Sequence, residues 1–139
     1  MKTLILSLSI FVLLVSLVSA GERKPIQPTA KDKCPVCGMF VAKYTDFLSQ
    51  IIYMDGSYAV FDGAKDLFKY YLNLQSYNPS KNESDIDSVY VTDYYTLTPI
   101  DGLTAYYVIG SNIYGAMGKE LIPFEKEADA REFMKDHNG

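Results

Sequence analysis

Hydrophobic positions follow two different periods along this chain. Runs of β-branched and aromatic residues predict strands, and Asp55-Gly56 between two such runs is a hairpin signal. Apolar residues then recur at helical spacing over 64–74, with Asp62 as the expected N-cap. The polar stretch 75–87 predicts a loop. The strands predicted in this first part of the chain are 40–44, 47–54, 58–61 and 88–96.

The order strand, glycine turn, strand, helix occurs a second time near the C-terminus. Ala130, Phe133 and Met134 fall on one face of the last predicted helix. We therefore expect two ββαβ-type units, 34–96 and 97–139, packed as one compact α+β domain. The second unit lacks a closing strand, because the sequence ends just after its helix. The elements predicted in it are strands at 105–109 and 121–124, a loop at 110–118 and a helix at 126–137.

The first twenty residues differ from the rest. Lys2 is followed by an apolar run and by small residues ending at Ala20, a pattern that predicts a cleaved signal peptide over 1–20 and export to the periplasm. The alternative is an uncleaved signal that anchors the protein in the membrane, since a spanning helix needs about 20 apolar residues. Residues 21–33 are rich in proline and charge and predict a flexible linker.

Composition narrows the range of functions. The 139 residues suit one domain, and a hydrophobic fraction of 48% supports a core. A net charge of −4 argues against nucleic-acid binding, which needs a basic face. The sequence shows no glycine-rich phosphate loop, no serine-nucleophile elbow and no paired acid and base. We therefore predict a binding protein with no catalytic residues.

Cys34 and Cys37 are the two cysteines, and four common interpretations of such a pair can be weighed first. A structural zinc site needs about four Cys or His ligands, so with one histidine, His137, it would require a dimer. A c-type haem needs histidine directly after the second cysteine, where Gly38 stands. A thioredoxin-like redox pair normally opens a helix after a strand, but it stays open as an alternative function. A stapling disulfide would close too short a loop to stabilise much.

The remaining interpretation is a soft-metal site. Thiolate and thioether ligands together favour Cu(I) over hard cations. In an extended chain residues i and i+2 point to the same side, so the sulfurs of Cys37 and Met39 can converge on one ion. Met117, flanked by glycine in a loop, is the candidate for a remaining ligand, whereas Met54 and Met134 are expected in the core. Cys34 is either a further ligand or an accessory.

Two separated motifs occur in order, Cys34-Pro-Val-Cys37-Gly-Met39-Phe-Val-Ala-Lys and Tyr114-Gly-Ala-Met117-Gly-Lys-Glu-Leu-Ile-Pro-Phe124. Together with the turn and helix entry between them, they resemble the NosL family, accessory proteins for assembling the copper sites of nitrous oxide reductase. The resemblance spans roughly 32–137. It implies an exported Cu(I) chaperone with Cys37, Met39 and Met117 as ligands. Its partner would be a client copper enzyme or a membrane copper-transfer machinery.

Three features depart from that family pattern. Members are often lipoproteins, and this sequence has no cysteine placed to accept a lipid. Gly-Ala-Met stands where many members have Gly-Pro-Met, and the closing strand of the second unit is missing. We predict a periplasmic copper chaperone, with a thiol–disulfide oxidoreductase that uses the Cys34–Cys37 pair as the alternative.

Overall fold

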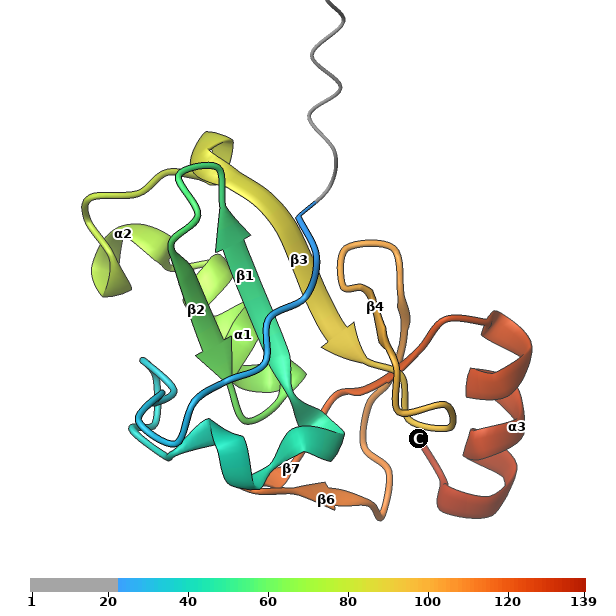
Figure 1. Ribbon diagram of the computed structural model, residues 1–139. Coiled ribbons are helices and arrows are strands. Elements are labelled where there is room, and N and C mark those ends of the chain that lie inside the picture. The colour runs from blue at the N-terminus through green and yellow to red at the C-terminus, as the bar shows by residue number, and fades with distance from the viewer. Residues whose placement is uncertain (1–22) are drawn as a thin grey trace, which may run out of the picture.

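The main sheet of the molecule has four antiparallel strands. The structure is a computed structural model that describes residues 23–139, and the predicted signal peptide lies outside the described residues (Figure 1). The strand order is β2-β1-β3-β4. The strands are β1 (Ser49–Tyr53), β2 (Tyr58–Phe61), β3 (Ile86–Thr92) and β4 (Pro99–Asp101). The Asp55-Gly56 hairpin is confirmed, and the positive φ of +86° at Gly56 explains why glycine suits that turn.

Helix α1 (Ala64–Tyr71) packs on β1 and β2 and buries Leu67 and Tyr70 against Phe61 in the first core cluster. The helical pattern predicted to run on to Leu74 breaks after Tyr71, and a separate short helix α2 (Leu74–Tyr77) follows. The prediction that Asp62 caps α1 is wrong. Gly63 occupies the N-cap position without a side-chain cap, because the Asp62 carboxylate accepts a hydrogen bond from a cysteine instead.

The second half again contains an antiparallel pair of strands followed by a helix. Strands β5 (Tyr106–Val108) and β8 (Ile122–Phe124) pair antiparallel, and α3 (Glu127–His137) packs on both. Between them the chain forms a small hairpin of β6 (Tyr114–Gly115) and β7 (Gly118–Lys119). A second core cluster joins these elements through Val108, Ile122, Phe124, Ala130 and Phe133. The α+β class is therefore confirmed, and within the described residues no strand follows α3.

Other local predictions need correction. The strand predicted at 40–44 is wrong: after a single bridge between Lys33 and Phe40 the chain turns through two 3₁₀ segments, η1 (Val41–Lys43) and η2 (Thr45–Phe47). Their turns close locally, with the Tyr44 amide donating to the Val41 carbonyl. The strand predicted at 88–96 ends at Thr92, because Asp93 binds the backbone of the turn after it.

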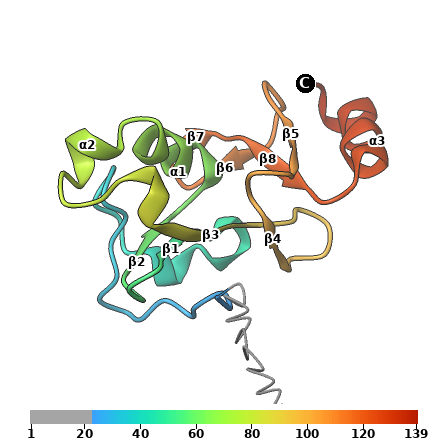
Figure 2. The ribbon, with the colours of Figure 1, turned by 90° about the horizontal axis from the view of Figure 1, so that it is seen from above.

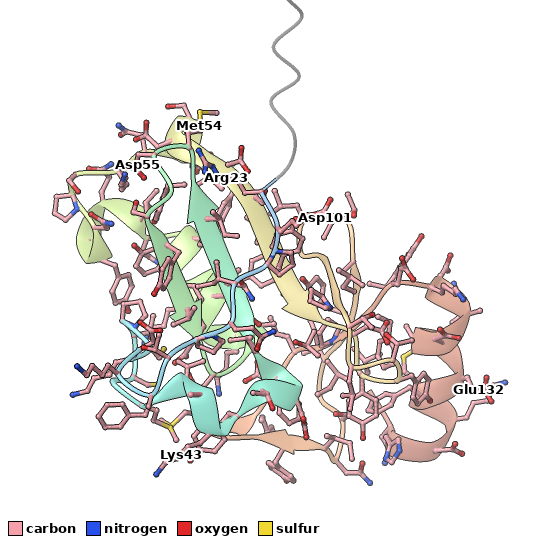
Figure 3. The ribbon with its side chains drawn as sticks, viewed as in Figure 1. Arg23, Lys43, Met54, Asp55, Asp101 and Glu132 are labelled. Atoms are coloured by element: carbon pink, nitrogen blue, oxygen red, sulfur yellow. The ribbon has the colours of Figure 1, made fainter. Side chains whose placement is uncertain are left out.

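Two methionines predicted in the core are exposed. The side chain of Met54 is 59% exposed and lies at the end of the sheet, as Figure 3 shows. Met134 is 36% exposed, whereas Ala130 and Phe133 on the same helix are buried as predicted. The apolar stripe of α3 is therefore narrower than its helical spacing suggests.

The segment predicted as a flexible linker lies against the sheet over its described part, residues 23–33. It crosses the face opposite α1 (Figures 1 and 2). The Ile26 amide donates to Gln50 Oε1 at 2.8 Å, and Gln50 Nε2 donates to the Ile26 carbonyl at 3.2 Å. The Tyr90 hydroxyl donates to the Arg23 carbonyl at 2.8 Å. These contacts fix the approach of the chain to its first cysteine. Among the described residues, no helix has the length and apolar character needed to cross a membrane.

Candidate metal site

The cysteines lie in a closed turn of the backbone, residues 34–39, which we call the cysteine turn. The Cys34 amide donates to the Met39 carbonyl at 2.9 Å, and the Gly38 amide donates to the Cys34 carbonyl at 2.8 Å. Gly38 has a φ of +80°, a left-handed conformation that glycine adopts without the steric cost a side chain would bring. The turn is therefore compact and leaves both cysteines as free thiols.

Two opposing effects act on the pKa values of the two thiols. The N–H groups of Val36 and Cys37 interact with the Cys34 sulfur, and the N–H of Met39 interacts with the Cys37 sulfur. Such donors stabilise a thiolate. In the metal-free protein burial outweighs them and raises the pKa of the Cys34 thiol and of the Cys37 thiol. The raised pKa values favour the protonated thiols, so a metal ion that binds the sulfurs has to displace the protons.

Two buried carboxylates accompany the thiols. Cys37 donates to Asp62 Oδ1 at 3.1 Å, and Cys34 contacts Asp66 Oδ2 at 3.5 Å. One sulfur or oxygen atom from each of these four residues lies within 4.8 Å of the others, close enough together to hold a metal ion. Asp62 and Asp66 are only 2% and 7% exposed; Asp62 precedes α1 and Asp66 lies in its first turn.

The hairpin of residues 114–119, which we call the Met117 hairpin, is attached to the same turn of α1. Lys65 Nζ donates to the Met117 carbonyl at 3.1 Å and to the Lys119 carbonyl at 2.8 Å. In return, Glu120 Oε1 accepts from the Lys65 amide at 2.6 Å. Lys65 stands between Asp62 and Asp66 in the sequence, so the hairpin is tied to the segment that contacts the thiols.

The structure brings the two predicted cysteine ligands into one cluster, and the predicted methionine ligands are more exposed than Cys34. Cys34 and Cys37 share one cluster, with Cys34 buried and Cys37 half-buried. Met39 closes the same turn and is half-buried. Met117 lies on the attached hairpin with its side chain 48% exposed. His137 is on α3, where it bonds Asn112.

Sequence reasoning missed both carboxylates and the Lys65–Glu120 contact. Asp62 was assigned a capping role and Asp66 no role. The Asp-x-x-x-Asp spacing at the start of a predicted helix was the available signal, because residues i and i+4 share a helix face. Lys65 and Glu120 are separated by 55 residues, and nothing in the sequence indicates that they meet.

The donor chemistry of the cluster suits a metal ion with a preference for sulfur. Thiolates bind soft and borderline ions, whereas carboxylates alone would favour hard cations. Here the carboxylates accept hydrogen bonds from the thiols, and the sulfurs are the softest donors of the cluster. The fold and the site together define a small α+β protein with two free thiols and two carboxylates clustered beside one helix start.

Comparison with known proteins places this protein in a family. The NosL family model matches residues 25–139, and the chain belongs to the NosL family. It is 27% identical over 138 residues to the copper-binding lipoprotein NosL of Stutzerimonas stutzeri, covering 88% of this chain and 69% of that protein. Its fold is similar to the crystal structure of the copper chaperone NosL from Shewanella denitrificans. That match has a TM-score of 0.67 at 23% identity and covers 85% of this chain and 90% of the other.

Proposed function

We propose that this protein is an exported copper chaperone that binds Cu(I) through the cysteine turn and the Met117 hairpin. The observation that carries the proposal is the pair of free thiols on one turn, clustered within 4.8 Å with the carboxylates of Asp62 and Asp66. The similarity to a protein named as a copper-binding lipoprotein supports copper as the bound metal and supports export of the protein. We place the protein in the periplasm.

The proposed ligands are the Cys37 thiolate and the Met39 and Met117 thioethers, with Cys34 as a further thiolate. Cu(I) favours such soft, low-coordinate sulfur sites. Each thiol that binds the ion loses its proton. Asp62 and Asp66, which already accept hydrogen bonds from these thiols, are the nearest proton acceptors. Backbone N–H groups then face the negative sulfurs and stabilise them.

The burial of the donors suggests an order for copper transfer. Met117 is half-exposed and Cys37 half-buried, whereas Cys34 is 1% exposed. A partner's soft ligands would therefore displace the Met117 thioether first and then the Cys37 sulfur, with Cys34 released last. The client would be a copper enzyme, such as nitrous oxide reductase, or the machinery that loads it. Ligand exchange of this kind needs no catalytic residue.

A thiol–disulfide oxidoreductase fits the geometry less well. Reactive redox cysteines have a lowered pKa and usually stand at a helix N-terminus. In this protein burial raises the pKa of both thiols, and the cysteine turn leads into 3₁₀ segments. A measured activity in insulin reduction would support the oxidoreductase over the chaperone.

Competition for Cu(I) tests the proposal. The protein is titrated with Cu(I) under anaerobic conditions against a chromophoric chelator, in the wild type and in the variants Cys37→Ser and Met117→Ala. One ion per chain is expected in the wild type, with a large loss of affinity in Cys37→Ser and a smaller loss in Met117→Ala. Sub-stoichiometric binding that is the same in all three proteins would overturn the proposal.

A further inference from the structure

Lys65 and Glu120 make reciprocal contacts between α1 and the Met117 hairpin. The Lys65 ammonium binds two carbonyls of the hairpin, those of Met117 and Lys119. The Glu120 carboxylate, one residue beyond the hairpin, accepts from the backbone amides of Lys65 and Leu121 at 2.6 and 2.9 Å. Lys65 thus binds the backbone of the Met117 hairpin, and Glu120 binds the backbone of α1. We call these two residues the Lys65/Glu120 pair.

The packing around Glu120 leaves room for its carboxylate only because glycines flank it. A Cβ atom at Gly63 would lie 2.1 Å from Glu120 Oε2, closer than real Cβ contacts allow. A Cβ at Gly115 would lie 3.2 Å from Glu120 Cγ. Glu120 is itself 6% exposed, and burial raises its pKa. Burying a carboxylate is costly unless hydrogen bonds compensate it, and here two backbone amides do so.

The Met117 hairpin has little of its own to hold it in place. Its strands contain two residues each and pair only with one another. An isolated two-stranded hairpin is marginally stable in water. The contacts made by the Lys65/Glu120 pair therefore tie the Met117 backbone to the start of α1, next to Asp62.

We propose that the Lys65/Glu120 pair is a positioning device that holds Met117 at the site formed by the cysteine turn. The inference rests on the proposed function, in which Met117 is a copper ligand. Neither Lys65 nor Glu120 touches the ion in this account. They act through Met117 by fixing its backbone carbonyl and the strand that follows it.

A double-mutant cycle on Cu(I) affinity tests this role. Glu120→Ala is measured alone and together with Met117→Ala, by competition with a chromophoric chelator. Loss of a supporting contact of a metal ligand typically lowers affinity about 10- to 100-fold. We expect Glu120→Ala to lower affinity about as much as Met117→Ala does, and to add little when Met117 is already absent. Glu120→Gln should restore most of the affinity, because its amide oxygen can accept from the same two backbone amides.

The outcomes distinguish failure of the positioning role from failure of the proposal that Met117 is a copper ligand. An equal loss from Glu120→Ala in both backgrounds, or no loss in either, would overturn the positioning role while leaving Met117 a ligand. No loss from Met117→Ala alone would overturn the ligand assignment itself. Both failures are read from the same titrations.

A second variant keeps the test open if Glu120→Ala does not fold. Lys65→Met keeps the apolar stem of the side chain and removes the ammonium that binds the hairpin carbonyls. We expect it to lower Cu(I) affinity only when Met117 is present. Lys69→Met, at an exposed position one turn further along α1, is the matched control and should leave affinity unchanged. Equal affinities for Lys65→Met and Lys69→Met would overturn the proposal.

Discussion

The Cys37 thiol donates a hydrogen bond to the Asp62 carboxylate at 3.1 Å. The two residues are 25 positions apart, and the contact joins the cysteine turn to the start of α1. It adds to the burial that raises the pKa of the thiol, and it would give the proton a nearby acceptor when a metal ion binds the sulfur. The same carboxylate is therefore removed from the helix-capping role that its position in the sequence suggests.

Replacement of Asp62 should make Cys37 more reactive. Burial is the main cause of the raised pKa of the Cys37 thiol, and hydrogen bonding to Asp62 adds to it. In Asp62→Asn the amide no longer stabilises the protonated thiol through a negative acceptor, so the pKa should fall toward its usual range. One pKa unit corresponds to about ten-fold more thiolate below the pKa. We expect alkylation of Cys37 at pH 8, followed by peptide mass spectrometry, to become faster than in the wild type.

The control for that measurement is Glu132→Gln, which removes a carboxylate of α3 far from the cysteine turn (Figure 3). Its alkylation rate should equal that of the wild type. A rate in Asp62→Asn no faster than in this control would contradict the role assigned to the Cys37–Asp62 hydrogen bond.

A substitution at Gly38 should weaken both the fold and copper binding. A Cβ at Gly38 meets nothing within 4 Å, so the cost arises from the positive φ and should be about 1 kcal/mol. Because Gly38 shapes the turn that aims the Met39 amide at the Cys37 sulfur, Gly38→Ala should also lower Cu(I) affinity about ten-fold. Chemical denaturation and chelator competition measure the two effects.

Gly110→Ala is the matched control for Gly38→Ala. Gly110 has a φ of +87° and equally open surroundings, but it follows β5 in the second unit. It should cost a similar free energy of unfolding and leave Cu(I) affinity as it is. If both variants lost affinity alike, the effect would be one of general stability and not of the cysteine turn.

Acid should destabilise the protein partly through Asp93. This buried carboxylate accepts from the amides of Tyr95, Thr96 and Glu125. Burial opposes its ionisation, but hydrogen bonds from Glu125 and Thr96 prevail and lower the pKa of Asp93. Because the folded pKa is lowered, its contribution is complete above the unfolded pKa of about 3.9 and is lost as pH falls through the folded value.

Asp93→Ala measures that contribution. Hydrogen bonds to a charged group contribute about 1.5–3 kcal/mol, so the variant should lose about 3 kcal/mol of unfolding free energy at pH 7. Its stability should also fall less steeply than the wild type's between pH 4 and pH 2. Parallel pH profiles for the two proteins would show that Asp93 does not have a lowered pKa.

Replacement of Phe133 should lower the stability of the protein without changing its copper affinity. Its ring is fully buried and lies 5.1 Å from that of Phe124 and 5.0 Å from that of Tyr94, in the second cluster. Phe133→Ala should cost about 3–5 kcal/mol of unfolding free energy. Copper affinity measured well below the melting temperature should stay unchanged, since the thiols belong to the first cluster.

The neighbouring Met134→Ala serves as the comparison, because Met134 is exposed on the same helix and should change stability by less than about 0.5 kcal/mol. Thermal unfolding followed by circular dichroism measures both variants. A Phe133→Ala variant as stable as Met134→Ala would contradict the packing described for α3.

Local sequence patterns predicted the parts of the fold that local physics determines. The strand at 58–61 has the predicted bounds, and α3 begins one residue later than expected. Both follow from short-range periodicity and turn chemistry. The 3₁₀ segments after Phe40 could not be foreseen, because their β-branched and aromatic residues have strand propensity while tertiary packing buries Val41 in a turn.

The candidate site shows the same division. Cys34, Cys37 and Met39 are close in sequence and were visible as a motif. The extended chain predicted between Cys37 and Met39 is wrong, because Gly38 with its φ of +80° places them in a turn. The contacts of Asp66 and Glu120 depend on how α1 and the Met117 hairpin pack, across 32 and 55 residues respectively. A carboxylate at a predicted helix start indicates an N-cap, and only the packing of the structure shows that Asp62 contacts a thiol instead.

The central claim is that sulfur atoms from both the cysteine turn and the Met117 hairpin hold one Cu(I) ion. X-ray absorption at the copper edge of the loaded protein measures the number and type of ligand atoms directly. The account predicts a Cu(I) edge with sulfur-only scattering in the wild type and one sulfur fewer in Met117→Ala. A first shell dominated by oxygen or nitrogen, or a sulfur count that does not change in Met117→Ala, would contradict it.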